Sequence, residues 1–483
     1  MKPLLEVVQD FFDSAINEPP ITSTEIIPLS GGDRRYFRFY TDKNSYIGCY
    51  NENIKENEVF FYYTNHFRAI DVPLPEILAI DTDRKIYILE DLGKASLLNN
   101  LEAKGLCDEV FDLYKKSLKE LARMQILGAK DLDFDKALTA KEFGKQAILS
   151  DLLYFKYYFV DTLKIPYDKQ QLLDDFDALA TYLTRTEYKM FMFRDFQSRN
   201  IIVNDGKVSF IDYQGGMKGA LQYDVASLLW QAKADLPENW KNELLEYYIS
   251  VIDELLPTPV QKEVFVSQYN GYVVIRMLQV LGAYGFRGLF ERKAHFLTSI
   301  PLALRNLKWF LSNRKVGLIV PTLDDILSQI TSDEVIHRFE PKKADENTPL
   351  VVKIKSFSYK KSGIPKDETG NGGGFAFDCR GILNPGRYEP YKTLTGRDKE
   401  VIDFLEQQTK MPDFMNNIYN IVDISVEDYM ARGFDSLAIN FGCTGGQHRS
   451  VYAAEQTARH LRNKYKVKVE LEHVEQGIKE VKY

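Results

Sequence analysis

Cysteine is scarce in this sequence, and its four cysteines lie far apart and form no CxxC pair. This spacing argues against a disulfide scaffold and against a structural zinc site. No apolar run reaches the roughly 18–20 residues that a membrane span needs. The opening residues, MKPLLEVVQDFFDS, have no long apolar core and no small-residue cleavage site. We therefore expect a protein of the reducing cytoplasm that has no membrane partner.

An excess of positive charge is also missing, because the formal net charge is −7. This balance argues against non-specific nucleic-acid binding by the chain as a whole. The sequence shows no internal repeat and no long low-complexity segment. At roughly 100–200 residues per domain, its 483 residues predict two to four domains.

The order of apolar patterns along the chain predicts how those domains are arranged. Short β-type runs and turn signals fill residues 24–92, and mostly helical spacing follows over 97–315 with a β-rich island at 191–214. Residues 331–350 are polar and highly charged, and an α/β pattern follows them. The prediction is an α+β domain of two lobes (1–320, lobes about 1–92 and 93–320), a linker (321–350) and a smaller α/β domain (351–483).

The most informative segment is FRDFQSRNIIVNDGKVSFIDYQGG at 193–216. It places Asp195 five residues before Asn200, and Asp212 follows after a short hairpin. Phosphoryl transfer needs one carboxylate to accept the proton of the attacking hydroxyl, and an amide and a second carboxylate to hold magnesium. The alternative is a polar hairpin whose acids sit in water or cap helices. Apolar runs that bracket each polar residue favour the phosphoryl-transfer site.

These residues resemble the aminoglycoside/choline phosphotransferase superfamily, and most of all its anomeric sugar kinases that act on N-acetylmuramate and N-acetylglucosamine. The resemblance covers roughly residues 5–315 and implies a protein-kinase-like fold. The similar strings are SGGDRRYFRF (30–39), VPLPEILAID (72–81), YILEDLG (87–93), FRDFQSRNIIV (193–203), FIDYQGGMKGALQYDVASLL (210–229) and RMLQVLGAYGFRG (276–288).

The resemblance implies ATP and magnesium as cofactors and Asp195 as the catalytic base. Gly31 and Gly32 would lie over the phosphates, where backbone N–H groups can approach closely. Asp224 would orient the catalytic loop or cap the following helix. The remaining implied residues are the magnesium ligands Asn200 and Asp212, and the adenine-contacting backbone of Glu90 and Leu92.

Two departures from the superfamily bear on activity. Phe193 stands where a histidine often precedes the catalytic aspartate, and SYIGCY (45–50) lacks the strand lysine that grips the α- and β-phosphates. Arg34, Arg35 or Arg38 could supply the missing charge, and we assign Arg35 to the ATP site. Without such a cation, the domain would be a weak kinase or a nucleotide-binding regulator.

A second informative segment, FGCTGGQHRS at 441–450, joins a strand to a helix. A glycine-containing loop at a helix N-terminus binds anions through free N–H groups and the helix dipole, and His448 and Arg449 add further donors. Cys443 and Arg449 also fit the C-x5-R spacing of cysteine-dependent phosphatases. Cys443 could instead be a small buried residue at a strand end.

Residues 352–476 resemble the C-terminal domain of the RNase adapter protein RapZ, through SFSYKKSGIP, FDCRGILNP, LTGRD and GCTGGQHRS. No GxxxxGK[ST] motif accompanies them. The resemblance implies a site for a sugar phosphate such as glucosamine 6-phosphate. The implied residues are Cys443, Thr444, Gly445, Gly446, His448, Arg449 and Arg397, with Arg380 as a helper.

The resemblance also implies RNA binding, for which the charge offers little support. Residues 350–483 contain 20 Lys and Arg against 18 Asp and Glu, a net charge of +2. Such a balance is a thin basis for RNA affinity. The best basic cluster is KYKVK (464–468), which alternates like an edge strand.

The leading hypothesis is an ATP- and magnesium-dependent kinase of a sugar hydroxyl, with an N-acetylated amino sugar as acceptor, joined to a sugar-phosphate-binding domain. One alternative is a catalytically weak regulator that binds nucleotide, sugar phosphate or RNA. Another is a kinase paired with a Cys443-dependent phosphatase. Residues 145–190 and 270–300, including Arg287 and His295, are expected to line the acceptor pocket, whereas the aromatic run 154–159 is expected to pack in the core.

Overall fold

The computed structural model describes residues 4–27, 34–291, 294–340, 342–367, 369–370 and 374–482. The chain divides into two compact units. The N-terminal unit comprises Met1–Phe290 and Ser299–Arg338, and the C-terminal unit comprises Glu291–Thr298 and Phe339–Tyr483.

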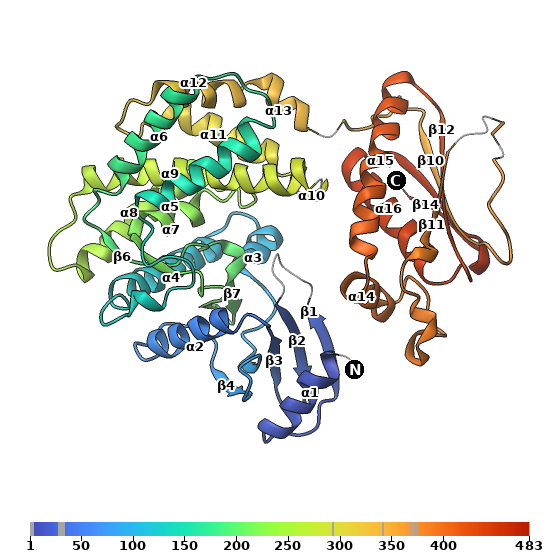
Figure 1. The fold of residues 1–483 in the computed structure, drawn as a ribbon, viewed down its shortest axis with the longest axis horizontal. Helices are drawn as coiled ribbons and strands as arrows, with labels where there is room; N and C mark the ends of the chain where they lie inside the picture. Colours follow the sequence, from blue (N-terminus) through green and yellow to red (C-terminus); the bar gives the residue numbers. More distant parts are fainter. Residues whose placement is uncertain are drawn as a thin grey trace. The chain divides into compact units, whose positions relative to one another are not determined.

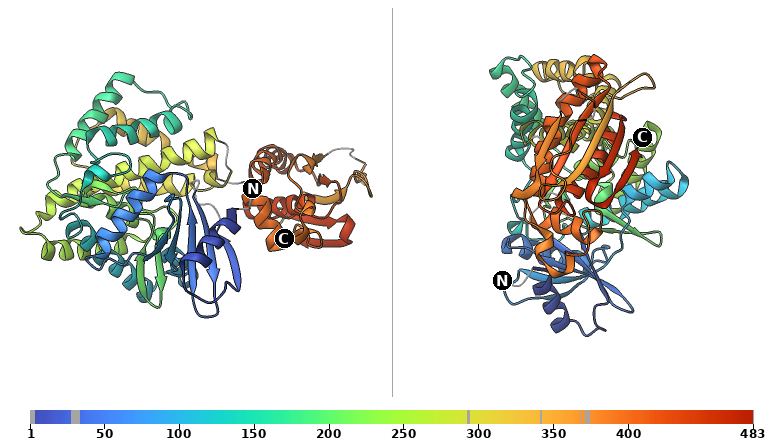
Figure 2. Two further views of the ribbon diagram at one scale, coloured as in Figure 1. Left: turned by 60° about the horizontal axis from the view of Figure 1, so that its bottom comes forward. Right: turned by 90° about the vertical axis from the view of Figure 1, so that its right-hand side faces the viewer.

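The first lobe of the N-terminal unit is an antiparallel five-stranded sheet in the order β1-β2-β3-β5-β4. The sheet and its α1 are blue in Figures 1 and 2. Amphipathic α1 buries Val8 and Phe12 against Phe37 and Phe39 of the sheet. The elements are α1 (Leu4–Ala15), β1 (Ser23–Ile27), β2 (Arg35–Tyr40), β3 (Ser45–Tyr50), α2 (Ile54–Arg68), β4 (Ile77–Ile80) and β5 (Ile86–Glu90).

The second lobe is mostly helical and begins after a short connection that follows β5. Its central helix, α9, contacts α5, α7 and α11 and buries much of its surface. The helices are α3 (Leu97–Lys104), α4 (Asp108–Ile126), α5 (Lys145–Phe155), α6 (Lys169–Leu183), α7 (Leu221–Leu229), α8 (Glu238–Leu255), α9 (Lys262–Tyr284), α11 (Ile300–Asn313), α12 (Pro321–Ile330) and α13 (Asp333–Phe339).

Among the described residues, one helical stretch, Lys262–Phe290, is long and apolar enough to cross a membrane. More than half of its apolar window is buried inside the protein, as expected of a core helix. Two small antiparallel ribbons complete the lobe. They are β6 (Lys189–Met192) with β9 (Met217–Ala220), and β7 (Ile201–Asn204) with β8 (Lys207–Phe210).

The segment expected to be a linker, 321–350, begins with two helices instead. Pro321 starts α12, as suits a residue without an N–H at a helix start. Leu323, Ile326, Leu327 and Ile330 lie on one buried face of α12. This apolar stripe packs the helix against α6, so the linker prediction was wrong over this part.

The C-terminal unit is built around a five-stranded sheet in the order β11-β12-β10-β13-β14. All neighbouring pairs are parallel except β13–β14, and Figure 1 shows α14, α15 and α16 beside one face. The bilobal α+β domain followed by a smaller α/β domain is therefore confirmed. The elements are α10 (Ala294–Leu297), β10 (Val351–Ser358), β11 (Phe375–Asp378), α14 (Lys399–Gln408), α15 (Met411–Arg432), β12 (Ser436–Cys443), α16 (Arg449–Tyr465), β13 (Lys468–His473) and β14 (Ile478–Lys482).

Candidate active site and a second anion-binding loop

The segment 193–216 forms one loop and hairpin in the second lobe, and it brings the three expected polar residues together. Asn200 donates through Nδ2 to the backbone carbonyl of Asp195 at 2.9 Å and to Asp212 Oδ2 at 3.4 Å. Asp212 lies two residues after the end of β8 and has a positive φ of 70°, which turns the chain sharply after the strand. The amide therefore ties the loop of Asp195 to the carboxylate of Asp212.

Asp224 fixes the position of this loop by binding its backbone. Its buried carboxylate accepts the backbone N–H groups of Phe193 at 2.7 Å and Arg194 at 2.9 Å, and the side chain of Gln125 at 2.8 Å. Burial raises the pKa of the Asp224 carboxyl to about 7, although these hydrogen bonds oppose the shift. Of the two expected roles, the structure gives Asp224 that of orienting the catalytic loop.

Phe193 is fully buried against the rings of Phe196, Phe210 and Tyr213. The aromatic residue that replaces the histidine therefore anchors the loop in the core. The neighbouring Arg194 has a φ of 80° and donates to both carboxylate oxygens of Asp151 at 2.8 Å. Sequence reasoning did not find Asp151, which lies on α5, far from the loop along the chain.

Arg276 of α9 contacts the expected base directly. Its Nη2 lies 3.2 Å from Asp195 Oδ1, and its Nη1 donates to Gln279 at 2.6 Å. The Arg276 side chain is 6% exposed, whereas that of Asp195 is 46% exposed. The carboxylate is thus held from the protein side and remains open to an acceptor.

A cavity of about 630 Å³ lies between the sheet and the second lobe within the N-terminal unit. Apolar side chains from both sides line it, among them Ile47, Leu89 and Ile211, and so do Asn200 and Asp212. The connection after β5 also lines it, including the expected residues Glu90 and Leu92. A cavity of this volume, lined by both apolar side chains and oxygen ligands, suits a nucleotide. Gly31 and Gly32, which were also assigned to this site, lie outside the described residues.

The three arginines near β2 have different positions. Arg34 and Arg38 line the cavity and Arg35 does not, so the assignment of Arg35 to the nucleotide site was wrong. Neighbouring residues along a strand point to opposite faces of the sheet, which explains why Arg34 and Arg38 face the cavity and Arg35 does not. Arg38 forms two hydrogen bonds to Asp91, at 2.7 and 3.1 Å, and therefore holds the connection between the lobes.

Asn200 and Asp212 offer oxygen ligands at the cavity end, and magnesium prefers such ligands. Burial and the nearby Asp195 carboxylate raise the pKa of Asp212, although its oxygens reach the open cavity. The described residues contain no group of three or more His, Cys, Asp or Glu that could hold a metal ion. Two ligands suit magnesium, which fills its remaining positions with water and phosphate oxygens.

The region expected to line the acceptor pocket is only partly open. In the run 154–159, Phe155 and Phe159 are fully buried, and Tyr154 and Tyr158 pack on Phe286. Arg287 stacks its guanidinium over Phe286, 5.6 Å from the ring centre. The His295 side chain lies outside the described residues. Most of this aromatic cluster is packing, as expected.

In the C-terminal unit, the loop 443–448 connects β12 to α16. Cys443 Sγ accepts the backbone N–H of Gly446 at 3.2 Å and lies 3.2 Å from Ser450 Oγ. Burial disfavours the thiolate, but these contacts and the charge of Arg449 outweigh it and lower the pKa of Cys443. Gly446 has a φ of +67°, and a Cβ there would lie 2.4 Å from Glu475 Cγ, so this position requires glycine.

Two residues beside the loop serve to support it. Arg449 is buried and donates through Nη1 to the carbonyls of Ile382 at 2.6 Å and Arg380 at 3.2 Å. His448 is also buried, and its Nε2 lies 2.8 Å from the Tyr391 carbonyl. In a cysteine phosphatase the arginine binds phosphate oxygens, so the engagement of Arg449 with backbone disfavours that alternative.

Arg397 was expected to bind the anion at the loop, but its side chain is engaged elsewhere. Its guanidinium pairs with Glu455 at 3.0 Å and Glu480 at 2.9 Å. The backbone next to it makes the contact instead, because Gly396 donates its N–H to the Gln447 carbonyl at 2.9 Å. The helper Arg380 pairs with Asp378 and stacks on Tyr359, 4.0 Å from the ring centre.

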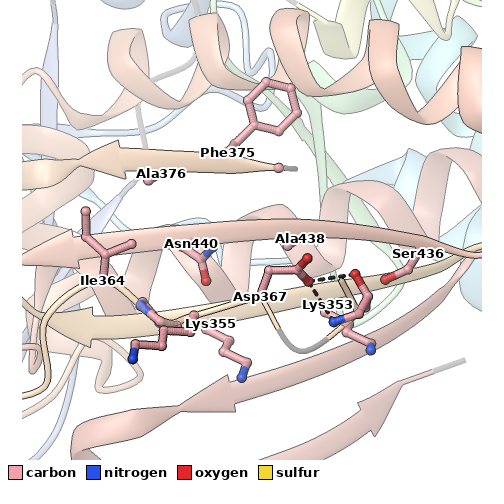
Figure 3. Close-up of a pocket in the computed structure, with 13 residues that line it drawn as sticks. Lys353, Lys355, Ile364, Asp367, Phe375, Ala376, Ser436, Ala438 and Asn440 are labelled. Carbon is pink, nitrogen blue, oxygen red and sulfur yellow. Dashed lines mark hydrogen bonds between the residues drawn. The ribbon is translucent and has the colours of Figure 1, made fainter. Parts of the chain in front are cut away.

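The C-terminal unit also has a groove of about 230 Å³ on its sheet (Figure 3). Val352 and Ile354 belong to the core beside α16, so the alternating Lys353 and Lys355 point to the opposite face. Lys355 pairs with Glu472 at 3.2 Å. The loop 443–448 does not line this groove, whose lining residues are Lys353, Lys355, Ile364, Pro365, Lys366, Asp367, Thr369, Gly374, Phe375, Ala376, Ser436, Ala438 and Asn440.

The cluster KYKVK does not form an edge strand. It covers the end of α16 and the start of β13, which lies between β10 and β14. Lys464 pairs with Asp423 at 2.7 Å. This lysine of the cluster is held in a close, largely buried ion pair, and Lys468 lies 4.0 Å from Glu470.

Comparison with known proteins gives a different family match for each of the two units. Residues 31–257 match the phosphotransferase enzyme family, and residues 350–477 match the RapZ C-terminal domain. Each of the two units therefore matches the model of a different family. Both resemblances are confirmed.

Two curated relatives match only about a quarter of the chain. A nucleotide-binding protein of Fervidobacterium nodosum is 38% identical over 129 residues, which are 26% of this chain and 44% of the relative. One of Xylella fastidiosa is 40% identical over 115 residues, 24% of this chain and 38% of the relative. The chain thus spans less than half the length of these relatives.

Two of the solved structures to which the chain is similar are small-molecule kinases. A choline kinase from Cryptosporidium parvum is 14% identical, with 67% of this chain and 99% of that chain covered and a TM-score of 0.46. An amicoumacin kinase solved with AMP-PNP and Ca²⁺ is 12% identical, with 67% and 97% covered and a TM-score of 0.45.

Proposed function

We propose that the N-terminal unit transfers a phosphoryl group from ATP to a hydroxyl of an N-acetylated amino sugar. The observation that carries the proposal is the nucleotide-sized cavity that ends at Asn200 and Asp212, on the same loop as the open carboxylate of Asp195. The amino sugar is suggested by the resemblance to anomeric sugar kinases and by the second unit, which resembles a domain for amino-sugar phosphates.

Each residue has a defined task in this reaction. Asp195 accepts the proton of the attacking hydroxyl, and Arg276 holds its carboxylate in place. Asp224 fixes the loop through two backbone N–H groups. Asn200 and Asp212 would hold magnesium, which when bound neutralises charge on the phosphates. The apolar walls exclude water from the nucleotide.

The test of this proposal is ADP release by the full chain with ATP and Mg²⁺ across a panel of acceptors. The panel contains N-acetylmuramate, N-acetylglucosamine, glucosamine, choline and an aminoglycoside. We expect turnover with an N-acetylated sugar well above the rate without acceptor, and loss of turnover when EDTA removes the metal. Turnover with choline or the aminoglycoside alone would contradict the sugar assignment, and ATP binding without any turnover would favour a regulator.

We further propose that the loop 443–448 of the C-terminal unit binds the phosphate of a phosphorylated amino sugar. Its backbone N–H groups lie at the start of the 17-residue helix α16, where the helix dipole attracts anions. RNA is not included, because the net charge of residues 350–483 is only +2.

The second test uses glucosamine 6-phosphate, measured by calorimetry against glucosamine. We expect Gly446→Ala to weaken binding at least about 10-fold, because its Cβ would collide with Glu475 and displace the loop. Gly433→Ala is the matched control, since Gly433 has a similar φ of +71° but open space around its Cβ. Equal affinity in both variants would show that the anion binds elsewhere.

Cys443→Ser distinguishes binding from catalysis at this loop. We expect neither this variant nor the wild-type chain to hydrolyse an aryl phosphate, and both to bind glucosamine 6-phosphate. Hydrolysis that is lost in Cys443→Ser would instead support the phosphatase alternative.

A further inference from the structure

The cation that kinases use to grip the nucleotide phosphates is missing from its usual strand. β3 reads SYIGCY and contains no lysine. In protein kinases such a lysine is paired with a glutamate on the neighbouring helix, and both must be in place for catalysis. The cavity here does contain a helix glutamate, Glu56, which lies in the first turn of α2.

Arg34 is the partner of that glutamate. Its Nη2 lies 2.6 Å from Glu56 Oε1, and the Arg34 side chain is only 9% exposed. Nη1 donates to the hydroxyl of Tyr36 at 3.0 Å, and the guanidinium lies 5.9 Å from the ring centre of Phe60. An arginine that enters from the start of β2 thus forms the ion pair for which β3 offers no lysine.

Arg34 has donors that the described part of the chain does not satisfy. Nε is buried and has no hydrogen-bond partner among the described residues, and the buried Nη2 meets only the Glu56 carboxylate, in an ion pair. Guanidinium donors left unpaired in a buried place are costly. They lie in the wall of a cavity that ends at Asp212, so an anion in that cavity would satisfy them.

The Arg34–Glu56 pair is connected to the metal side of the cavity by one glutamine. Gln214 Nε2 donates to Asp212 Oδ1 at 2.9 Å and to Glu56 Oε1 at 3.3 Å. Arg34, Glu56, Gln214 and Asp212 therefore form a continuous row from the first lobe to the second. A polyphosphate along this row would meet the guanidinium at one end and the magnesium ligands at the other.

The other nearby cations are occupied or lie at the rim. Arg38 donates twice to Asp91 and once to the carbonyl of Gly93. Lys94 pairs with Glu25 at 2.6 Å, and its side chain is 60% exposed. Arg34 is the described cation that combines burial, unpaired donors and a place in the wall.

We propose that Arg34, held by Glu56, binds the α- and β-phosphates of the nucleotide in place of the missing strand lysine. The inference rests on the proposed function, because it takes the cavity to be the ATP site. It adds a specific residue, and it makes the domain a competent kinase in spite of its lysine-free β3.

Nucleotide binding by the full chain tests this inference separately from catalysis. Adenosine, ADP and AMP-PNP are titrated with Mg²⁺ into the wild type, Arg34→Gln, Arg34→Lys and Arg84→Gln. We expect Arg34→Gln to lose about 10- to 100-fold in affinity for ADP and AMP-PNP, as for loss of charge-assisted hydrogen bonds. The affinity for adenosine should not change. Arg34→Lys should lose less affinity for ADP and AMP-PNP than Arg34→Gln, because lysine keeps the positive charge but lacks the paired donors of the guanidinium.

Arg84 is a matched control, because it also pairs with a glutamate of α2, Glu58, but does not line the cavity. Arg84→Gln should bind all three ligands as the wild type does. If the wild type binds ADP and Arg34→Gln binds it equally tightly, the role of Arg34 is refuted and the kinase proposal stands. If Arg34→Gln also loses adenosine, Arg34 shapes the pocket and does not bind phosphate, which overturns the inference. Failure of the wild type to bind ADP would overturn the nucleotide site itself.

Discussion

Replacing Asp195 with asparagine should reduce phosphoryl transfer by about 100- to 10,000-fold, the range that positioned acid–base groups contribute. The amide keeps the size of the carboxylate but cannot accept the proton of the hydroxyl. Nucleotide binding should survive, because Asp195 is not among the residues that line the cavity. The measurement is ADP release with the best acceptor of the panel, accompanied by AMP-PNP titration.

Asp205→Asn is the matched control for this variant. Asp205 lies in the exposed turn of the β7–β8 hairpin with a φ of 48°, which asparagine tolerates well. It makes the same chemical change ten residues from Asp195 and should leave the rate intact. A rate for Asp195→Asn within threefold of the wild type would rule out Asp195 as the base.

Asp224→Ala should destabilise the N-terminal unit by about 2–4 kcal/mol and abolish activity. The change leaves the buried N–H groups of Phe193 and Arg194 without acceptors, at roughly 1–3 kcal/mol each. Removal of a carboxylate that burial disfavours offsets part of this loss. The measurement is urea unfolding of the full chain, with Asp112→Ala on the exposed side of α4 as control.

The effect of Asp224→Ala should also depend on pH. The carboxyl has a pKa of about 7 in the folded chain against a usual value of 3.8, so the folded state binds more protons between these values. Stability from this group therefore falls as pH rises from about 4 to 7. The variant lacks this dependence, so the difference in unfolding free energy should be larger at pH 5 than at pH 8. A difference that grows with pH would contradict the raised pKa.

The sequence predicted that the central residues of the candidate site lie together, because they are close together along the chain. Asp195, Asn200 and Asp212 share one loop and hairpin, whose apolar runs reveal the strand ends. Asp151 and Arg276 lie 43 residues from Arg194 and 81 residues from Asp195 respectively. Helix packing brings them to the loop, and no local pattern marks them.

Register and composition explain the other differences. Arg34 and Arg35 are adjacent and chemically identical, and only the pairing of β2 with its neighbours decides which faces the cavity. In the expected linker, the charged residues of 331–350 are typical of a solvated segment, but the apolar stripe of α12 precedes them. Its spacing at 323, 326, 327 and 330 was a readable helical signal.

The buried hydrogen bonds that join Asp224 to two helices affect how activity would be lost on heating. Asp224 accepts from Gln125 of α4, and Gln125 in turn accepts the hydroxyl of Tyr248 of α8 at 2.5 Å. All three side chains are fully buried. The loop is therefore fastened to the helical interior and cannot loosen by itself, as active-site loops of low local stability do. On heating, inactivation should coincide with unfolding of the helical lobe and should not precede it.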